Sequence, residues 1–270
     1  MQIKMTTHDN TAEIKNFVRE LVQNLDEVSG LDMVWRRGVV HLGGPHYRLR
    51  GTLGPISLGE DECAIFGRLI EAFQPRNCFI IGNAFGMSSA FIAKMMERNG
   101  GASVITLDSQ SEGDGSRCFQ TAQKISERMN CRILKNKSGW SPQDIGAAVE
   151  DEKYDLIFID GDHSHPQVTK DFEGIQPLVG DETIVCWHDY WMDGIPESVA
   201  AAEAEGYRCI KVNSSCEIVF GTKNRAIFDR VGSLFSNTEA PHKRRRPLAY
   251  LKLYNALAVG AVKSYVLGKN

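Results

Sequence analysis

Between residues 78 and 220 the sequence alternates short apolar segments with longer segments of helical periodicity. The expected strands are residues 78–82, 103–108, 131–134, 154–160, 183–187, 207–212 and 217–220. The expected helices are residues 87–98, 118–129, a segment that opens at Ser141-Pro142, 165–178 and 195–205. Near-continuous apolar strands need cover on both faces, so this pattern predicts a mostly parallel sheet between two helix layers, a doubly wound α/β fold.

The last two expected strands are joined by only three residues, Asn213–Ser215. This connection is too short for a crossover helix, and parallel neighbours require one. We therefore expect an antiparallel hairpin at one edge of a seven-stranded sheet.

The segments that flank this core differ from it in composition. Residues 1–59 contain one expected helix (11–25) and an irregular stretch rich in glycine and arginine, and we expect them to form a lid or acceptor-binding element. A further helix at 60–74 opens the core, which we place at residues 60–223. Residues 224–270 form an expected tail, with a basic run at Lys243–Arg246 followed by an amphipathic helix.

Composition excludes several functional classes. A net charge of -3 argues against a nucleic-acid-binding surface spread over the protein. The seven cysteines form no C-x-x-C pair, so neither a zinc knuckle nor a redox dithiol is indicated, and a reduced, cytoplasmic protein is expected. The N-terminus lacks the apolar stretch of a secretory signal, and the uncharged run at 253–262 is shorter than the ~18 residues that suggest a membrane span. The sequence leaves open whether the protein forms a homo-oligomer.

The loop after the first expected strand reads Gly82-Asn-Ala-Phe-Gly86. Glycines in such a loop let the backbone approach a ligand closely. A dinucleotide-binding loop needs a glycine where Ala84 stands, so the spacing favours a ligand without phosphates. Asp108 ends the next strand, where a carboxylate can accept hydrogen bonds from two ribose hydroxyls. An adenosine ligand fits this combination, and a plain strand-to-helix turn is the alternative.

On these residues the chain resembles the class I S-adenosylmethionine (SAM)-dependent methyltransferases over roughly residues 60 to 222. The resemblance implies that the 82–88 loop holds the amino-acid part of SAM, that Asp108 binds the ribose, and that residues 138–141 face the adenine. The chain departs from the family at Trp140, where an aspartate is common, and at Ile80, where an acid is common. The implied cofactor contacts are Gly82, Asn83, Ala84, Phe85, Ser88, Asp108, Ser109, Trp140, Ser141 and Asp160.

Acidic and histidine side chains gather after the fourth and fifth expected strands. The fourth strand ends at Asp160 and is followed by Asp162, His163 and His165, and the fifth is followed by His188 and Asp189. Ionisable groups at the end of a buried strand are unfavourable unless they are paired or functional. Neighbouring strand ends would bring Asp160, His188 and Asp189 to one point. They could bind a metal there, or they could simply hydrogen-bond one another.

The Ile-Asp-Gly-Asp-His run and the later His-Asp pair resemble the methyltransferase branch that modifies cephalosporins, macrolides and sugars at oxygen. The resemblance implies that Asp160 and the pair His188–Asp189 hold a divalent metal, and that His163 is the general base. His188 departs from the carboxylate that is more common in this branch. Magnesium prefers oxygen ligands, so an imidazole would shift the preference towards manganese. Asp162 is expected to be solvated, and His165 to begin its helix.

These observations predict a SAM-dependent O-methyltransferase that acts on a hydroxyl of a small molecule, such as a sugar or a natural product. One alternative is a nicotinamide-dependent oxidoreductase, although the chain has no Tyr-x-x-x-Lys pair after the fourth strand. The other alternative is a methyltransferase-like binding protein without catalysis, which the departures at Ile80, Trp140 and His188 keep open.

Overall fold

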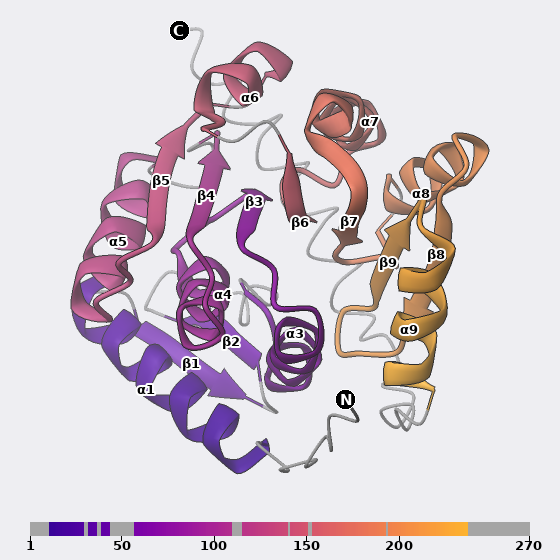
Figure 1. Cartoon of the computed structure of the whole chain (residues 1–270). Coiled ribbons are helices and arrows are strands. Elements are labelled where there is room, and N and C mark those ends of the chain that lie inside the picture. Colours follow the sequence, from indigo (N-terminus) through magenta and orange to yellow (C-terminus); the bar gives the residue numbers. More distant parts are fainter. Residues whose placement is uncertain are drawn as a thin grey trace, which may run out of the picture.

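Figure 1 shows the computed structural model of the chain. It describes residues 11–29, 32–36, 39–43, 57–109, 115–139, 141–150, 153–192 and 194–236.

A seven-stranded sheet forms the centre of the described chain. Its strands are β3 (Asn77–Ile81), β4 (Ser103–Asp108), β5 (Leu134–Ser138), β6 (Tyr154–Ile159), β7 (Val179–Trp187), β8 (Arg208–Val212) and β9 (Ile218–Thr222). Their order across the sheet is β5-β4-β3-β6-β7-β9-β8, and the first five run parallel. Strand β9 is antiparallel to both β7 and β8. The doubly wound fold and its antiparallel edge hairpin are therefore confirmed.

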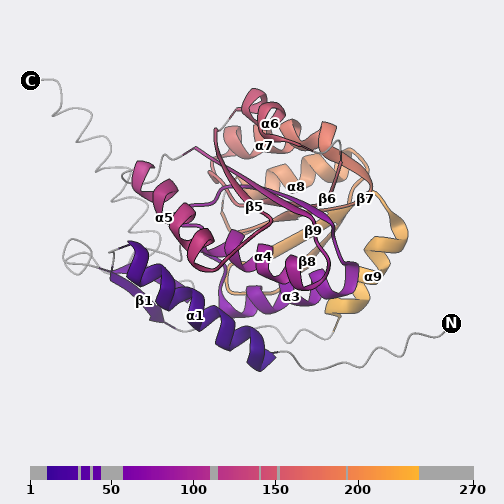
Figure 2. The same cartoon turned by 60° about the vertical axis from the view of Figure 1, so that its left-hand side comes forward.

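Helices cover both faces of this sheet. The helices are α1 (Thr11–Ser29), α3 (Glu60–Phe73), α4 (Met87–Arg98), α5 (Gly115–Arg128), α6 (Pro142–Ala148), α7 (His165–Ile175), the short 3-10 helix η1 (Gln176–Leu178), α8 (Ile195–Ala204) and α9 (Arg225–Phe235). Figure 2 shows α1, α3, α4 and α5 on one side of the sheet and α6, α7 and α8 on the other.

Side-chain alternation along the strands divides the interior into two hydrophobic cores. In β6, Phe158 belongs to the core beneath α1, α3 and α4, whereas Ile157 and Ile159 belong to the core beneath α7 and α8. Cys186 and Trp187 of β7 divide in the same way. Because successive side chains point to opposite faces, the residues that follow β6 and β7 at positions 160 and 188 turn towards α3.

The structure differs most from the sequence prediction at β5, at the β1–β2 hairpin and at α9. Strand β5 is Leu134–Ser138 rather than 131–134, because the polar segment Leu-Lys-Asn-Lys-Ser forms a half-covered strand at the edge of the sheet. The stretch expected to be irregular contains a hairpin of β1 (Asp32–Arg36) and β2 (Val39–Gly43). Helix α9 was not expected, and it packs against β8, β9 and α3 through Val231 and Phe235.

Helix α1 is part of the packed interior, because Val18, Leu21 and Leu25 are fully buried and the helix contacts α3, α4 and α5. The division into a 1–59 extension, a 60–223 core and a 224–270 tail stays a prediction, as does the lid. The basic run Lys243–Arg246 and the helix expected after it lie outside the described residues. Among the described helices, none is long and apolar enough to cross a membrane.

Trp187 gives a test of this packing. Its fully buried indole donates a hydrogen bond from Nε1 to Ser198 Oγ on α8, at 3.2 Å. We expect Ser198→Ala to lower the free energy of unfolding by about 1–3 kcal/mol, because the indole N–H is left unpaired in the core. Urea unfolding followed by tryptophan fluorescence measures this. Ala201→Ser at an exposed position of the same helix is the control, and equal losses in the two variants would contradict the assignment.

Candidate active site

The ends of β3 and β6 meet through their backbones. Gly82 follows β3 with φ +88°, and a Cβ built on it would lie 2.0 Å from the carbonyl oxygen of Asp160. The amide of Asp160 in turn donates to the carbonyl of Ile81. Only glycine fits here, since both the backbone angle and the space exclude a side chain. The predicted cofactor loop and the predicted acidic cluster are thus in direct contact.

Asp108 holds the next residues of this loop. Its Oδ2 accepts hydrogen bonds from the backbone amides of Asn83 (2.6 Å) and Ala84 (2.9 Å). Ala84 has φ +41°, in the left-handed region that is unfavourable for a residue with a side chain. The carboxylate therefore stabilises a strained turn at the end of β3, and its expected contact with a ribose stays a prediction.

Two other residues of the predicted cofactor loop make internal contacts. The buried side chain of Asn83 accepts from Ser89 Oγ (2.5 Å) and donates to Asn136 Oδ1 (2.9 Å). Ser88 Oγ accepts from the amide of Leu58 at 3.1 Å. These side chains fix the loop against β5 and against the segment before α3.

Three more of the predicted cofactor contacts follow β3, β4 and β5 in the chain. Phe85 is buried in the core beneath α4. Ser109 is exposed just beyond β4. Ser141 begins α6 as its N-cap and shares a capping box with Asp144. Trp140, expected at the adenine, lies outside the described residues.

Asp160, His163 and Asp189 form an acidic and histidine cluster beyond β6 and β7. One ligand atom of each lies within 4.8 Å of those of the other two. His163 Nε2 is 3.3 Å from Asp189 Oδ2, outside hydrogen-bond geometry, so this buried nitrogen has no hydrogen-bond partner among the described residues. Asp189 has φ +54°, which an aspartate tolerates, and its Oδ1 accepts from Trp191 Nε1 at 2.8 Å.

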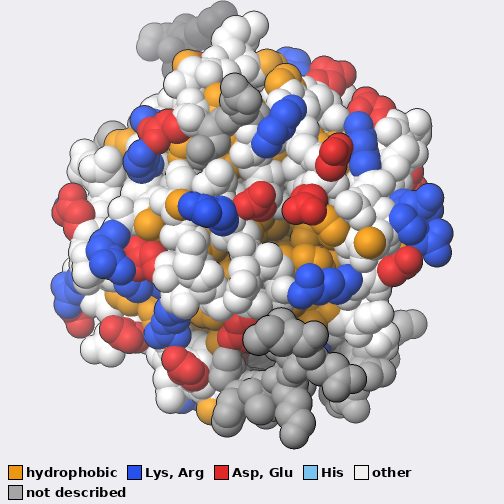
Figure 3. All heavy atoms as spheres, viewed as in Figure 1, with side chains coloured by type: hydrophobic (Ala, Val, Ile, Leu, Met, Phe, Trp, Pro, Cys, Tyr) orange, Lys and Arg blue, Asp and Glu red, His pale blue; other side chains and the backbone are white. Residues whose placement is uncertain are grey.

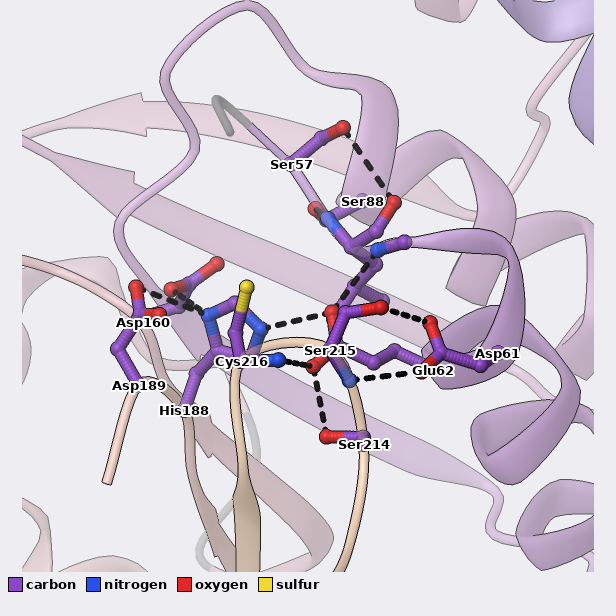
Figure 4. A network of polar contacts seen from close by, with 12 residues as sticks. Ser57, Asp61, Glu62, Ser88, Asp160, His188, Asp189, Ser214, Ser215 and Cys216 are labelled. Atoms are coloured by element: carbon purple, nitrogen blue, oxygen red, sulfur yellow. Dashed lines mark hydrogen bonds and ion pairs between the residues drawn. The ribbon is translucent and has the colours of Figure 1, made fainter. Parts of the chain in front are cut away.

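His188 lies behind this cluster, and carboxylates contact both of its ring nitrogens. Nδ1 is 2.8 Å from Asp160 Oδ1 and 3.4 Å from Asp189 Oδ2, while Nε2 is 3.1 Å from Glu62 Oε2. Figure 4 shows the ring between the two aspartates and the glutamate. The structure thus brings together the predicted residues Asp160, His163, His188 and Asp189.

Glu62 of α3 is the residue of this network that the sequence did not reveal. It is fully buried, and its carboxylate accepts from the amides of Gly59 and Cys216 and from Ser214 Oγ, in addition to its contact with His188. In the sequence it is one of three acids in the first turn of α3, a common arrangement at a helix N-terminus. No local signal separates it from its neighbours.

A methyltransferase family model matches the part of the chain that carries most of this site. The family is described as a methyltransferase domain, and the match covers residues 79–190. Residues 79–190 of this chain thus match a methyltransferase domain. The resemblance to class I SAM-dependent methyltransferases is thereby confirmed, and the match favours that class over the nicotinamide-dependent alternative.

Solved structures share the fold of this domain. The O-methyltransferase TomG from Streptomyces achromogenes, solved with SAM, has a TM-score of 0.55 at 12% identity, over 79% of this chain and 96% of its own. A methyltransferase from Podospora anserina bound to S-adenosylhomocysteine (SAH) has a TM-score of 0.54 at 10% identity, over 82% and 98%. The Bacillus cereus O-methyltransferase in complex with SAH has a TM-score of 0.51 at 18% identity, over 81% and 92%. No curated protein matches the chain.

The charges in the candidate active site depend on one another. Burial lowers the pKa of His188, but Asp160, Asp189 and Glu62 raise it well above the usual value, so the ring is held as a cation. Burial raises the pKa of Glu62, but the charge and hydrogen bond of His188 outweigh burial, so that the pKa lies below its usual value. Burial also raises the pKa of Asp189, while His188 and His163 lower it. The site therefore contains ionised carboxylates around a buried imidazolium.

The neighbours of His163 change its pKa. Burial lowers its pKa, but the carboxylates of Asp189 and Asp160 raise it, and the net shift is upward. A higher pKa makes the neutral ring a stronger proton acceptor.

The donor set fits a divalent cation at Asp160 and Asp189. Carboxylate oxygens are hard ligands, and magnesium is commonly bound by one or two carboxylates while it keeps several waters. His163 Nε2 also faces this position without a hydrogen-bond partner among the described residues. His188 fits less well, because both of its ring nitrogens already contact carboxylates. The predicted metal set of Asp160, His188 and Asp189 stays a prediction.

A pocket of about 470 Å³ lies away from this site, near the starts of β3, β6 and β7, and includes Arg76, Asp155 and Glu182 in its lining. Figure 3 shows one face of the molecule with acidic and basic side chains interspersed around a hollow that exposes hydrophobic side chains. The candidate active site is therefore distinguished by its chemistry and its place at the strand ends, not by the size of a hollow.

The contact between Gly82 and Asp160 can be tested with a matched pair of glycines. Gly100 has nearly the same φ, +82°, but a Cβ there would meet nothing within 4 Å. We expect Gly100→Ala to lower the free energy of unfolding by about 1–2 kcal/mol, the strain of a left-handed residue alone. Gly82→Ala adds a backbone collision and should cost more than about 4 kcal/mol or prevent folding. Urea unfolding of both variants measures this, and equal losses would refute the close approach.

Proposed function

We propose that this methyltransferase transfers the methyl group of SAM to a hydroxyl oxygen of a small molecule. The observation that carries the proposal is the backbone contact of Gly82 with Asp160 in a methyltransferase domain. It joins a loop suited to the methyl donor to a cluster suited to activating a hydroxyl. The O-methyltransferases with the same fold that are described above support the same reaction type.

The chain's own residues would bind the donor and activate the acceptor. Bound SAM supplies a methyl group that is already activated on a sulfonium sulfur. The 82–88 loop and Asp108 would hold the donor, so that the acceptor oxygen can line up with the methyl carbon and the sulfur. His163 Nε2 would take the proton of the acceptor hydroxyl, and Asp189, 3.3 Å away, would stabilise the protonated ring.

We further propose that Asp160 and Asp189 hold a magnesium or manganese ion. Such an ion lowers the pKa of a coordinated hydroxyl, which makes deprotonation easier near neutral pH. In this proposal the two carboxylates supply the protein ligands and His163 remains the base. His188 orients the carboxylates instead of binding the ion, because its ring nitrogens contact Glu62 and Asp160.

The donor site is tested by isothermal titration calorimetry with SAH, with NAD as the comparison ligand. We expect SAH to bind with micromolar affinity, on the order of -8 kcal/mol, and NAD not to bind, because Ala84 replaces the glycine that a pyrophosphate requires. Absence of SAH binding, with and without magnesium or manganese, would refute the proposed donor.

The base is tested by comparing His163 with the nearby His165. Wild type, His163→Gln and His165→Gln are incubated with SAM and a panel of monosaccharides and phenols, and SAH formation is measured. We expect His163→Gln to lower turnover about 10²–10⁴-fold with SAH affinity retained, since only the proton acceptor is lost. His165, exposed at the start of α7, should be replaceable without effect.

The proposed cation is tested in the same assay. EDTA should lower wild-type turnover, and magnesium or manganese should restore it.

Equal turnover by His163→Gln and wild type would exclude His163 as the base. Turnover that does not change with EDTA would exclude the proposed cation. If the wild type binds SAH but converts no member of the panel, the hydroxyl classes tested are not its acceptors.

A further inference from the structure

Glu62 lies outside the residues matched by the methyltransferase model, yet it reaches the centre of the candidate active site. Its carboxylate is fully buried on α3. A buried carboxylate is unfavourable unless it is paired and hydrogen-bonded. Four contacts satisfy it here, and one of them, to His188, connects it to the predicted catalytic residues.

The contacts form a line from Glu62 through His188 to Asp160. Glu62 Oε2 is 3.1 Å from Nε2 of the ring, and Asp160 Oδ1 is 2.8 Å from Nδ1 on the other side. A histidine with carboxylates at both nitrogens can donate to both, and each bond then limits rotation of the ring. Figure 4 shows this arrangement, with Cys216 beside the ring.

The ring is also fixed by packing. His188 is 3% exposed, and the ring of Phe158 lies edge-on to it with centroids 5.9 Å apart. The amide of His188 donates to the carbonyl of Ile159, which continues the pairing of β6 with β7. Asp160 therefore meets an imidazole whose place is set by β7 and whose rotation is set by Glu62.

Neighbouring Asp61 has a different set of partners. Its two carboxylate oxygens accept from the amide and the hydroxyl of Ser215, at 2.7 Å each. It thus attaches α3 to the β8–β9 turn, as Glu62 does through Ser214 and Cys216, but no hydrogen bond of Asp61 to His188 is found among the described residues. Comparing Asp61 with Glu62 therefore distinguishes a residue that only attaches α3 to this turn from one that also contacts the active site.

We propose that Glu62 is a positioning residue of the active site, which acts through His188 to fix the carboxylate of Asp160. The proposal rests on the proposed function, in which Asp160 faces the cation and the acceptor. Glu62 itself does not touch the reacting atoms. It keeps His188 directed at Asp160 Oδ1, so that the carboxylate keeps one orientation towards the substrate.

The experiment compares Glu62→Gln, Asp61→Asn, His188→Gln and the double variant Glu62→Gln/His188→Gln in the full chain. The first readout is the NMR signal of the His188 ring N–H groups in the wild type, assigned by its loss in His188→Gln. The second is kcat and KM for SAM with whichever acceptor of the panel the wild type converts. Circular dichroism and thermal unfolding check that each variant is folded.

We expect two hydrogen-bonded ring N–H signals from wild-type His188, with the Nε2–H signal shifted in Glu62→Gln and unchanged in Asp61→Asn. Glu62→Gln should lower kcat about 10- to 100-fold, the usual effect of removing a residue that orients a ligand carboxylate, with KM for SAM within about twofold. The double variant should be no slower than His188→Gln, because the two residues act as one unit.

Several results would overturn the proposal. One is a wild type without a hydrogen-bonded Nε2–H signal, which decides the matter even if Glu62→Gln does not fold. Others are an unchanged kcat in Glu62→Gln, an equal loss in Asp61→Asn, or additive losses in the double variant. If the wild type binds no SAH and converts no acceptor, the proposed function fails. The positioning role then fails with it. In that case a shift of the His188 Nε2–H signal in Glu62→Gln would show only that Glu62 contacts His188.

Discussion

The buried carboxylate of Glu62 is the interaction on which the arrangement of the candidate site depends. A charge without solvent access has to be compensated by donors, and this one draws them from three separate parts of the chain. They are the residues before α3, the end of β7 and the turn between β8 and β9. Moving any of these segments would leave part of the charge unpaired, so the carboxylate fixes the positions of the three segments relative to one another.

The other constraint is the absence of a side chain at Gly82. Parallel neighbours bring their carboxyl ends to one edge of a sheet, but side chains normally keep the following loops apart. Here the backbone after β3 lies against the carbonyl of Asp160, so the loops of two neighbouring strands touch. Placing the donor and the acceptor side by side requires this proximity. The topology supplies the neighbouring strands β3 and β6, and the glycine allows the final approach.

The sequence could predict the sheet and its order of elements because buried parallel strands and amphipathic helices have strong periodic patterns. It failed where the pattern is weak. Strand β5 is polar because it lies at the edge of the sheet, and residues 132–133, which were expected to be part of it, form a turn. The β1–β2 hairpin and α9 were missed because short elements at the margins of a domain have little periodicity.

The acidic and histidine cluster could be predicted for a related reason. Asp160, His163, His188 and Asp189 each follow a strand, and strand ends can be read from the sequence. Glu62 could not, because its role arises from a contact over 126 positions of the chain. An amphipathic helix with three acids in its first turn gives no sign that the last of them, Glu62, is the one to be buried. Only the packing of α3 over β6 and β7 separates Glu62 from the acids beside it.

The two histidines illustrate how position decides chemistry between identical side chains. His188 continues a buried strand, and carboxylates contact both of its nitrogens, so its proton is held and its ring is fixed. His163 stands in the loop beyond β6, and its Nε2 faces Asp189 without a hydrogen bond. A proton acceptor must be able to gain and release its proton during each turnover, which the geometry of His163 permits and that of His188 opposes. In the proposed reaction His163 therefore carries the proton, and His188 keeps the carboxylates in place.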